Sequence, residues 1–422
     1  MEPKELLLQA LDSDKESQVK LLQAFVRAAS PNPPGDTEAA AAVLVDYLSS
    51  RGIHSELITP QPGRPNIVSE FVGGKGPGPR VVLNGHIDVF PVGDDTSGWT
   101  RDPWSGDVAD GRIHGRGVVD MKSGTASLVI AYAYLYEKRE FLHGSVALCA
   151  VSDEETGGKF GTKYLIQQNK ARWGGDVMLS AEPSGQTIRF SEKGTLRLSG
   201  SIRTKGAHGA YLNLSKGAIR TATAFLADIV QAVESMSFDI PEDIKVHLKK
   251  REVLKAIDRA MGEGTSTIIA RPTVNIGTIQ GGVKVNMIPD HCVFELDIRL
   301  PIGLTAEGVL SVIRSFFPRY TEATIEISVQ EAASNPSSFS SISHPMIECL
   351  TTNAERVVPS LRPELIPSMG ATDCKHYRYA GIPAYVYGCS PYSMAMVNES
   401  ASVAEFLEVT KVQAAATWDF LQ

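Results

Sequence analysis

The sequence contains few cysteines. Five among 422 residues are too sparse for a disulfide framework, and an odd number leaves at least one thiol unpaired. Such usage is typical of a reducing compartment, so we expect a cytoplasmic protein. Residues 1–9 are charged and lack the apolar core of a secretion signal. These absences argue against a small secreted domain that depends on disulfides.

Long apolar runs and excess positive charge are also missing. No apolar stretch approaches the roughly 20 residues needed to cross a bilayer, so we expect no membrane-spanning segment. The net charge of −7 provides no basic surface for nucleic acid. We find no low-complexity tract and no repeat of fixed period. With 43% hydrophobic and 21% charged residues, the chain has enough apolar material for two or more globular cores.

The segment 81–89, Val-Val-Leu-Asn-Gly-His-Ile-Asp-Val, contains the first candidate functional residues. A short apolar run typical of a strand ends at Gly85, and His86 and Asp88 follow. Side chains two positions apart on an extended segment point the same way, so both can face one pocket. A histidine there can bind a metal, and a nearby carboxylate can orient its ring. Taken alone, the pattern also fits a strand that ends in a polar loop.

Acidic side chains recur at other expected strand ends and before an expected helix. They are Asp120 before the helix 126–138, Glu154 and Glu155 after the strand 145–151, and Glu182 after the strand 176–180. Each has an ordinary explanation, because Asp is common at helix N-caps and paired glutamates are common in solvated turns. Open α/β sheets, however, place their sites at the carboxyl ends of strands. The combined set of carboxylates and one histidine therefore indicates a divalent metal site, and we expect the metal to be zinc.

The hydrophobic pattern changes near residue 194 and changes back near residue 305. Between these points, expected strands alternate apolar and polar residues and accompany one amphipathic helix; they are 195–204, 273–279 and 291–300, with the helix at 217–236. This pattern favours a small α+β domain with one helical face. We therefore predict an α/β catalytic domain with a mixed sheet, formed by residues 1–193 and 305–422. The α+β domain is inserted at 194–304.

In this order, the motifs resemble a family of zinc metallopeptidases and aminoacylases. It includes glutamate carboxypeptidase, acetylornithine deacetylase, succinyl-diaminopimelate desuccinylase and carnosine dipeptidase. The resemblance covers nearly the whole chain, through motifs at 84–89, 115–122, 153–157, 180–183, 206–208, 275–282, 286–289 and 370–373. It implies a ferredoxin-like inserted domain that serves as a lid and forms a homodimer. It also implies hydrolysis of amides in small N-acyl amino acids or dipeptides, as by a carboxypeptidase, aminoacylase or deacetylase.

The resemblance implies a pair of metal sites. His86 and Glu182 would bind one zinc, Glu155 would bind the other, and Asp120 would bridge the two. The peptide bond that follows Asp120 is usually cis in this family. Asp88 would support His86 without touching the metal. Co²⁺ or Mn²⁺ could substitute for zinc.

The resemblance also implies roles in substrate binding and catalysis. Glu154 would be the general base that takes a proton from the metal-bound water. His208, from the inserted domain of a partner subunit, would stabilise the carbonyl oxygen in the transition state. Asn286, Arg299 and Gly370 would contact the substrate, and the two-pronged donor geometry of arginine suits a substrate carboxylate.

One position departs from the family pattern. In the segment 392–400, Met396 stands where the family has a metal-binding histidine. A thioether is a poor replacement for imidazole on zinc, so we expect the second metal to be weak or absent. The first site keeps three ligands and an open position, which suffices for catalysis. Cys374, His376 or Cys389 could supply a replacement ligand, or could simply pack in the fold.

Three functions are compatible with this departure. The first is a zinc hydrolase for small amides, which the complete three-ligand set and Glu154 favour. The second is a repurposed enzyme that forms an amide, cyclises a substrate or works without metal, which Met396 favours. The third is a scaffold without catalysis, although such a protein would have no physical need for so many buried polar groups.

Overall fold

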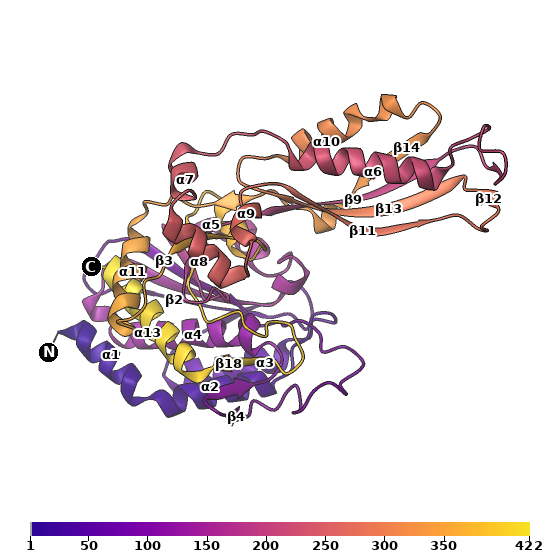
Figure 1. Cartoon of the computed structure of the whole chain (residues 1–422). Coiled ribbons are helices and arrows are strands. Elements are labelled where there is room, and N and C mark those ends of the chain that lie inside the picture. Colours follow the sequence, from indigo (N-terminus) through magenta and orange to yellow (C-terminus); the bar gives the residue numbers. More distant parts are fainter. Residues whose placement is uncertain (1) are drawn as a thin grey trace. The chain divides into compact units, whose positions relative to one another are not determined.

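The computed structural model describes residues 2–422 and divides into two compact units (Figure 1). The larger unit comprises residues up to 190 together with 339–366 and 372–422. The smaller unit comprises 191–338 and 367–371. No helix among the described residues is long and apolar enough to cross a membrane.

A nine-stranded mixed sheet runs through the fold in the order β1-β2-β6-β3-β7-β17-β8-β15, with β16 beside β8. The strands are β1 Glu56–Ile58, β2 Asn66–Val72, β3 Arg80–His86, β6 Ser145–Val151, β7 Val177–Ser180, β8 Ile188–Glu192, β15 Ser338–Phe339, β16 Leu365–Ser368 and β17 Ala384–Val386. β3 pairs in parallel with both β6 and β7. Their carboxyl ends therefore lie at one edge, and the polar motifs after each of them meet there.

Helices cover both faces of the sheet in the larger unit. They are α1 Pro3–Ser13, α2 Lys15–Arg27, α3 Glu38–Ser50, α4 Ser123–Glu137, α5 Thr162–Trp173, α11 Pro345–Val357, α12 Cys374–Tyr379 and α13 Val403–Phe420. α4 is apolar all round and is buried from Ser123 to Leu135, as expected for a central helix. α5 and α12 pack through Leu165, Trp173 and Tyr377 on Val82 and its sheet neighbours. α1 and α2 are separate helices that meet at Asp14.

A small three-stranded sheet brings the C-terminal segment beside the Gly-rich loop. β4 (Val108–Ala109) pairs with β5 (Arg112–His114), and β5 pairs with β18 (Ser400–Ser402). Ser400 lies opposite His114 in this ladder. The residues just before β18 are therefore held close to the loop that follows β5, which contains Asp120.

The smaller unit has the ferredoxin-like order of two βαβ halves. Its elements are β9 Gly194–Arg203, α6 Ala218–Glu234, β11 Thr273–Gly281, β13 His291–Leu300, α10 Ala306–Ser315 and β14 Thr324–Val329. The antiparallel sheet has the order β11-β13-β9-β14, and α6 and α10 pack on it through one hydrophobic core. Three further helices, α7 Glu242–His247, α8 Arg251–Met261 and α9 Thr265–Ile268, lie between α6 and β11 in the chain.

The predicted domain boundary at residue 304 is wrong. The prediction assigned 305–338 to the catalytic domain, but β14 pairs with β9 from Thr324 to Val329. Val309 and Ile313 of α10 belong to the core of the smaller unit. The reason is topological, because strands β9, β11 and β13 and helix α6 alone leave one edge of β9 and part of the helical layer uncovered. The sequence alone shows no break between these elements and the α/β region that follows.

Candidate metal centre

His86 ends β3 with its ring fixed by the backbone. The side chain is 1% exposed, and its Nδ1 lies 2.7 Å from the carbonyl oxygen of Asp88. A carbonyl only accepts hydrogen bonds, so Nδ1 carries the proton and a neutral ring has its lone pair on Nε2. This is the tautomer that a metal-binding histidine requires.

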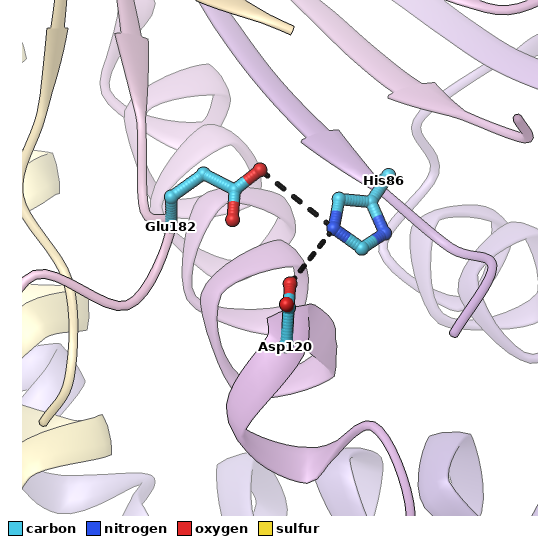
Figure 2. A group of neighbouring side chains, drawn as sticks. All are labelled: His86, Asp120 and Glu182. Atoms are coloured by element: carbon cyan, nitrogen blue, oxygen red, sulfur yellow. Dashed lines mark hydrogen bonds and ion pairs between the residues drawn. The ribbon is translucent and has the colours of Figure 1, made fainter. Parts of the chain in front are cut away.

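Two carboxylates converge on that Nε2 atom (Figure 2). Asp120 Oδ1 lies 3.1 Å away and Glu182 Oε1 lies 3.7 Å away. One ligand atom from each of the three side chains lies within 4.8 Å of the other two. Asp120 belongs to the one-turn π-helix η1 (Val118–Lys122), and Glu182 follows β7. The predicted first ligand set is therefore assembled from three segments of the larger unit.

Glycine permits the close packing that brings these segments together. Gly117 has φ 76°, and a Cβ there would lie 2.0 Å from the side chain of Val89. At Gly124, on the first turn of α4, a Cβ would lie 2.1 Å from the carbonyl oxygen of Ala181. Larger residues would thus push the Asp120 loop away from β3 and from Glu182. The expected cis peptide bond joins Asp120 to Met121.

The group fits a divalent cation. A neutral His86 presents a lone pair to two carboxylates, and only a proton or a cation between them makes that arrangement favourable. Burial raises the pKa of Glu182 well above its usual range, and the charge of Asp120 adds to this although His86 opposes it. Two carboxylates with one imidazole are ligands that zinc accepts. These residues could therefore hold a metal in an otherwise unfavourable cluster of charge.

Asp88 has a different structural role from the one expected. Its carboxylate lies 3.6 Å from His86 Nδ1, whereas its backbone carbonyl makes the shorter contact to that atom. The carboxylate instead accepts backbone N–H groups from Asp153, Glu154 and Glu155 at 3.0, 3.2 and 3.1 Å. Asp88 thus fixes the turn that contains both glutamates, and it contacts His86 mainly through the main chain.

Glu154 and Glu155 occupy the short 3₁₀-helix η3 (Glu154–Thr156) after β6. Burial raises the pKa of Glu154 to about 7, although the nearby Lys375 lowers it. Lys375 Nζ lies 3.6 Å from Glu154 Oε1. Burial and then the charge of Asp120 raise the pKa of Glu155 to about 9. Glu155 Oε1 is buried without a hydrogen-bond partner, which is consistent with an atom oriented for a cation.

The second ligand set is less complete. Within residues 2–422, the only group of three or more His, Cys, Asp or Glu placed to share an ion is the first set, without Glu155. The side chain of Met396 is 63% exposed. Cys374 and Cys389 are buried, and His376 Nε2 donates to the carbonyl oxygen of Gly157 at 3.2 Å. None of these three candidate replacements belongs to the metal-binding group.

The other predicted substrate residues lie in the smaller unit. His208 in β10 (Ala207–His208) pairs with β12 (Met287–Ile288), and Asn286 accepts the N–H of Gly209 at 2.8 Å. Arg299 is near the far end of β13, where it binds Asp297 at 2.9 Å and Thr195 at 3.1 Å. Gly370 lies in the loop after β16. His208 and Asn286 are therefore neighbours, and Arg299 lies far along the sheet from both.

Two lysines near the site were not anticipated from the sequence. Lys122 is fully buried, and its ammonium group donates to the carbonyl oxygens of Phe25 and Ala28 at 2.8 and 2.6 Å. Lys375, whose ammonium group lies beside Glu154, is two positions after the last residue of the motif at 370–373. Lysines are ordinarily exposed, so composition gives no reason to expect either side chain near the site. The only signal in the sequence was that Lys122 lies within the motif at 115–122 and Lys375 lies just after the motif at 370–373.

Comparison with known proteins places the chain in a family. The model of peptidase family M20/M25/M40 matches residues 82–419, so the chain belongs to that family. It is a hydrolytic enzyme that acts on peptide or other amide bonds. The succinyl-diaminopimelate desuccinylase of Methylorubrum extorquens is 26% identical over 408 residues, which cover 94% of this chain and 97% of that relative.

Solved structures support the fold. The M20 metallo-carboxypeptidase Sso-CP2 of Sulfolobus solfataricus has a TM-score of 0.75 at 19% identity, covering 96% of this chain and 99% of that one. Human carnosine dipeptidase 1 has a TM-score of 0.74 at 18% identity, covering 100% and 99%. These likenesses confirm the predicted α/β fold with a mixed sheet and two domains.

Proposed function

We propose that this enzyme is a zinc-dependent hydrolase of small N-acyl amino acids or dipeptides. The observation that carries the proposal is the convergence of Asp120 and Glu182 on Nε2 of His86, whose Nδ1 is engaged by the carbonyl oxygen of Asp88. These three side chains would hold one zinc ion. The exposed Met396 gives no support to a second ion of comparable affinity.

Each step of hydrolysis has a candidate group in this chain. A bound zinc ion supplies Lewis acidity, which polarises the carbonyl and makes water a better nucleophile near neutral pH. Glu154, with a pKa of about 7, can accept a proton from the attacking water and return it to the leaving amine. Lys375, 3.6 Å from that carboxylate, keeps part of the Glu154 population ionised.

Recognition of a carboxylate-bearing substrate is assigned to the smaller unit. Arg299 uses two nitrogen atoms for Asp297 and Thr195, and a guanidinium group has five N–H donors in all. His208 Nδ1 accepts the N–H of Ala210 at 3.2 Å, so its Nε2 carries the proton and can donate to an oxyanion. Asn286 and Gly370 would complete the contacts to the substrate.

A homodimer would explain the separation of these residues. Arg299 and the pair of His208 and Asn286 lie near opposite ends of the sheet of the smaller unit. β13 alone extends over about 30 Å at the usual rise per residue. One small substrate cannot span that distance within a single chain. A second copy would therefore supply His208 and Asn286, with the smaller unit as the dimerisation and lid domain.

Metal loading and hydrolysis test this proposal together. After dialysis against trace zinc, Co²⁺ or Mn²⁺, we expect about one ion per chain, with loss of the ion in His86→Ala. The exposed histidine variant His54→Ala is the matched control and should keep the metal. The loaded enzyme should hydrolyse at least one member of a panel of N-acyl amino acids and dipeptides. If the folded, loaded enzyme hydrolyses none, the proposal fails in favour of the repurposed enzyme or the scaffold.

A further inference from the structure

Glu399 is a buried carboxylate that binds the loop containing Asp120. It lies immediately before β18 and is 1% exposed. Its Oε2 atom accepts Arg116 Nη1 at 2.6 Å and the N–H of Gly117 at 3.1 Å. Its Oε1 atom accepts the N–H of Val119 at 2.9 Å and that of Asp120 at 3.4 Å. One side chain therefore binds the main-chain N–H groups of Gly117, Val119 and Asp120.

The Asp120 loop needs such an acceptor. Gly117 is left-handed, and Asp120 has non-helical backbone angles inside η1, so a regular helical ladder does not satisfy these amides. Buried N–H groups without partners are destabilising, and amides that point to one place form a site for an anion. Glu399 is that anion, and Arg116 balances its charge.

The loop is also fixed from the other side. Lys122 donates from its ammonium group to the carbonyl oxygens of Phe25 and Ala28 at the end of α2. Between these two attachments, the side chain of Asp120 is 26% exposed and is oriented toward His86. The position of the Asp120 carboxylate is thus determined by its main chain. Glu399 binds the amides of that main chain, and Lys122, two residues after Asp120, attaches it to the end of α2.

The same segment contains the departure from the family pattern. Arg116 Nη1 donates to the carbonyl oxygen of Met396 at 3.3 Å as well as to Glu399. Met396 and Glu399 therefore belong to one segment, which Arg116 attaches to the Asp120 loop. Loss of a ligand at 396 leaves the attachment at 399 intact. The parallel with Asp88, which accepts three amides of the Glu154 turn, indicates the same mode of support at both loops.

We propose that Glu399 is the positioning residue for Asp120 and thereby sets the metal affinity of the group formed with His86 and Glu182. This inference rests on the proposed function, because it assumes that the group binds a divalent metal. Replacement of a residue that orients a metal ligand without touching the metal typically lowers metal affinity or activity by about 10–100-fold. Glu399→Gln retains one oxygen acceptor but removes the charge and half of the acceptor capacity.

Zinc affinity and local hydrogen exchange test the inference on the full chain. In Glu399→Gln we expect the zinc dissociation constant, measured by competition with a chromophoric chelator, to rise by about 10–100-fold. We also expect faster amide exchange at residues 117–120 in the metal-free protein, with little change elsewhere. Glu405→Gln is the matched control, because Glu405 accepts a single backbone N–H, from Ser390 at 2.8 Å, in the same C-terminal region. It should leave both readouts unchanged.

Other results would overturn the inference. These are unchanged zinc affinity in Glu399→Gln, or weaker affinity with exchange raised equally throughout the chain. If Glu399→Gln does not fold, Glu399→Asp keeps the charge beside Arg116 but shortens the reach by one methylene, and the same readouts apply. If the wild-type chain binds no zinc, the proposed function fails. The inference fails separately if exchange at 117–120 does not depend on Glu399.

Discussion

The two ligand sets of the candidate metal centre differ in their side chains more than in their backbone support. His86, Asp120 and Glu182 come from three segments and lie within 4.8 Å of one another. Glu155 stands outside that group, and Met396 is largely exposed. Yet Asp88 binds the amide of Glu155, and Arg116 donates to the carbonyl oxygen of Met396 as well as to Glu399. Main-chain support is therefore present at both segments, although only the first predicted ligand set is brought together.

Replacement of the proposed base should have the largest effect on activity. Glu154→Gln removes the proton acceptor but keeps the size of the side chain, so we expect kcat to fall by about 10²–10⁴-fold. Zinc content should stay unchanged, because Glu154 is not in the ligand group. Steady-state kinetics on the best substrate and elemental analysis of the same sample measure both effects. A variant with wild-type kcat would show that another group moves the proton.

Introduction of an imidazole at position 396 tests the predicted second ligand set directly. In Met396→His we expect bound zinc to rise from about one to about two ions per chain, because imidazole is a good zinc ligand. Met394→His adds a histidine to the same loop at a position that is 41% exposed in the wild type, and it should not add a metal. Elemental analysis after dialysis distinguishes the two variants. Two ions in the wild type would mean that another side chain replaces the missing ligand.

The smallest effect concerns His376, which supports the Glu154 turn through Gly157. Burial lowers its pKa to about 4, the charges of Lys375 and Lys163 act in the same direction, and Asp373 opposes them. In the unfolded chain the ring takes up a proton near its ordinary pKa of 6.5. Between these values the unfolded state binds more protons, so the stability from His376 is lost as the pH falls from about 6.5 to about 4.

We expect this loss to be on the order of 2 kcal/mol for the wild type. His376→Gln keeps a donor for Gly157 but does not titrate, so its free energy of unfolding should decline less over that range. Urea unfolding of metal-free protein at pH 7 and pH 4.5 measures the difference. The exposed variant His54→Gln should follow the wild-type curve. Equal acid sensitivity in all three proteins would show that His376 does not contribute.

Much of the catalytic architecture could be predicted from the sequence. Strands β6 and β13 begin and end where their apolar patterns indicate. The polar residues after β3, β6 and β7 were recognisable because parallel strands bring their carboxyl ends to one edge. Periodicity and motif order are local properties, and a chain with strong local signals shows them without a structure.

The tertiary structure decided what local signals cannot express. The fourth strand of the smaller unit follows a helix that resembles the α/β region after it, so only pairing with β9 assigns it. Asp88 lies two positions after His86 in sequence, but its carboxylate binds amides 65 to 67 positions away. Glu399 binds amides about 280 positions away. The sequence by itself determined which chemical groups this enzyme has. Folding decided which main-chain amides each carboxylate binds, because packing selects hydrogen-bond partners that are distant in sequence.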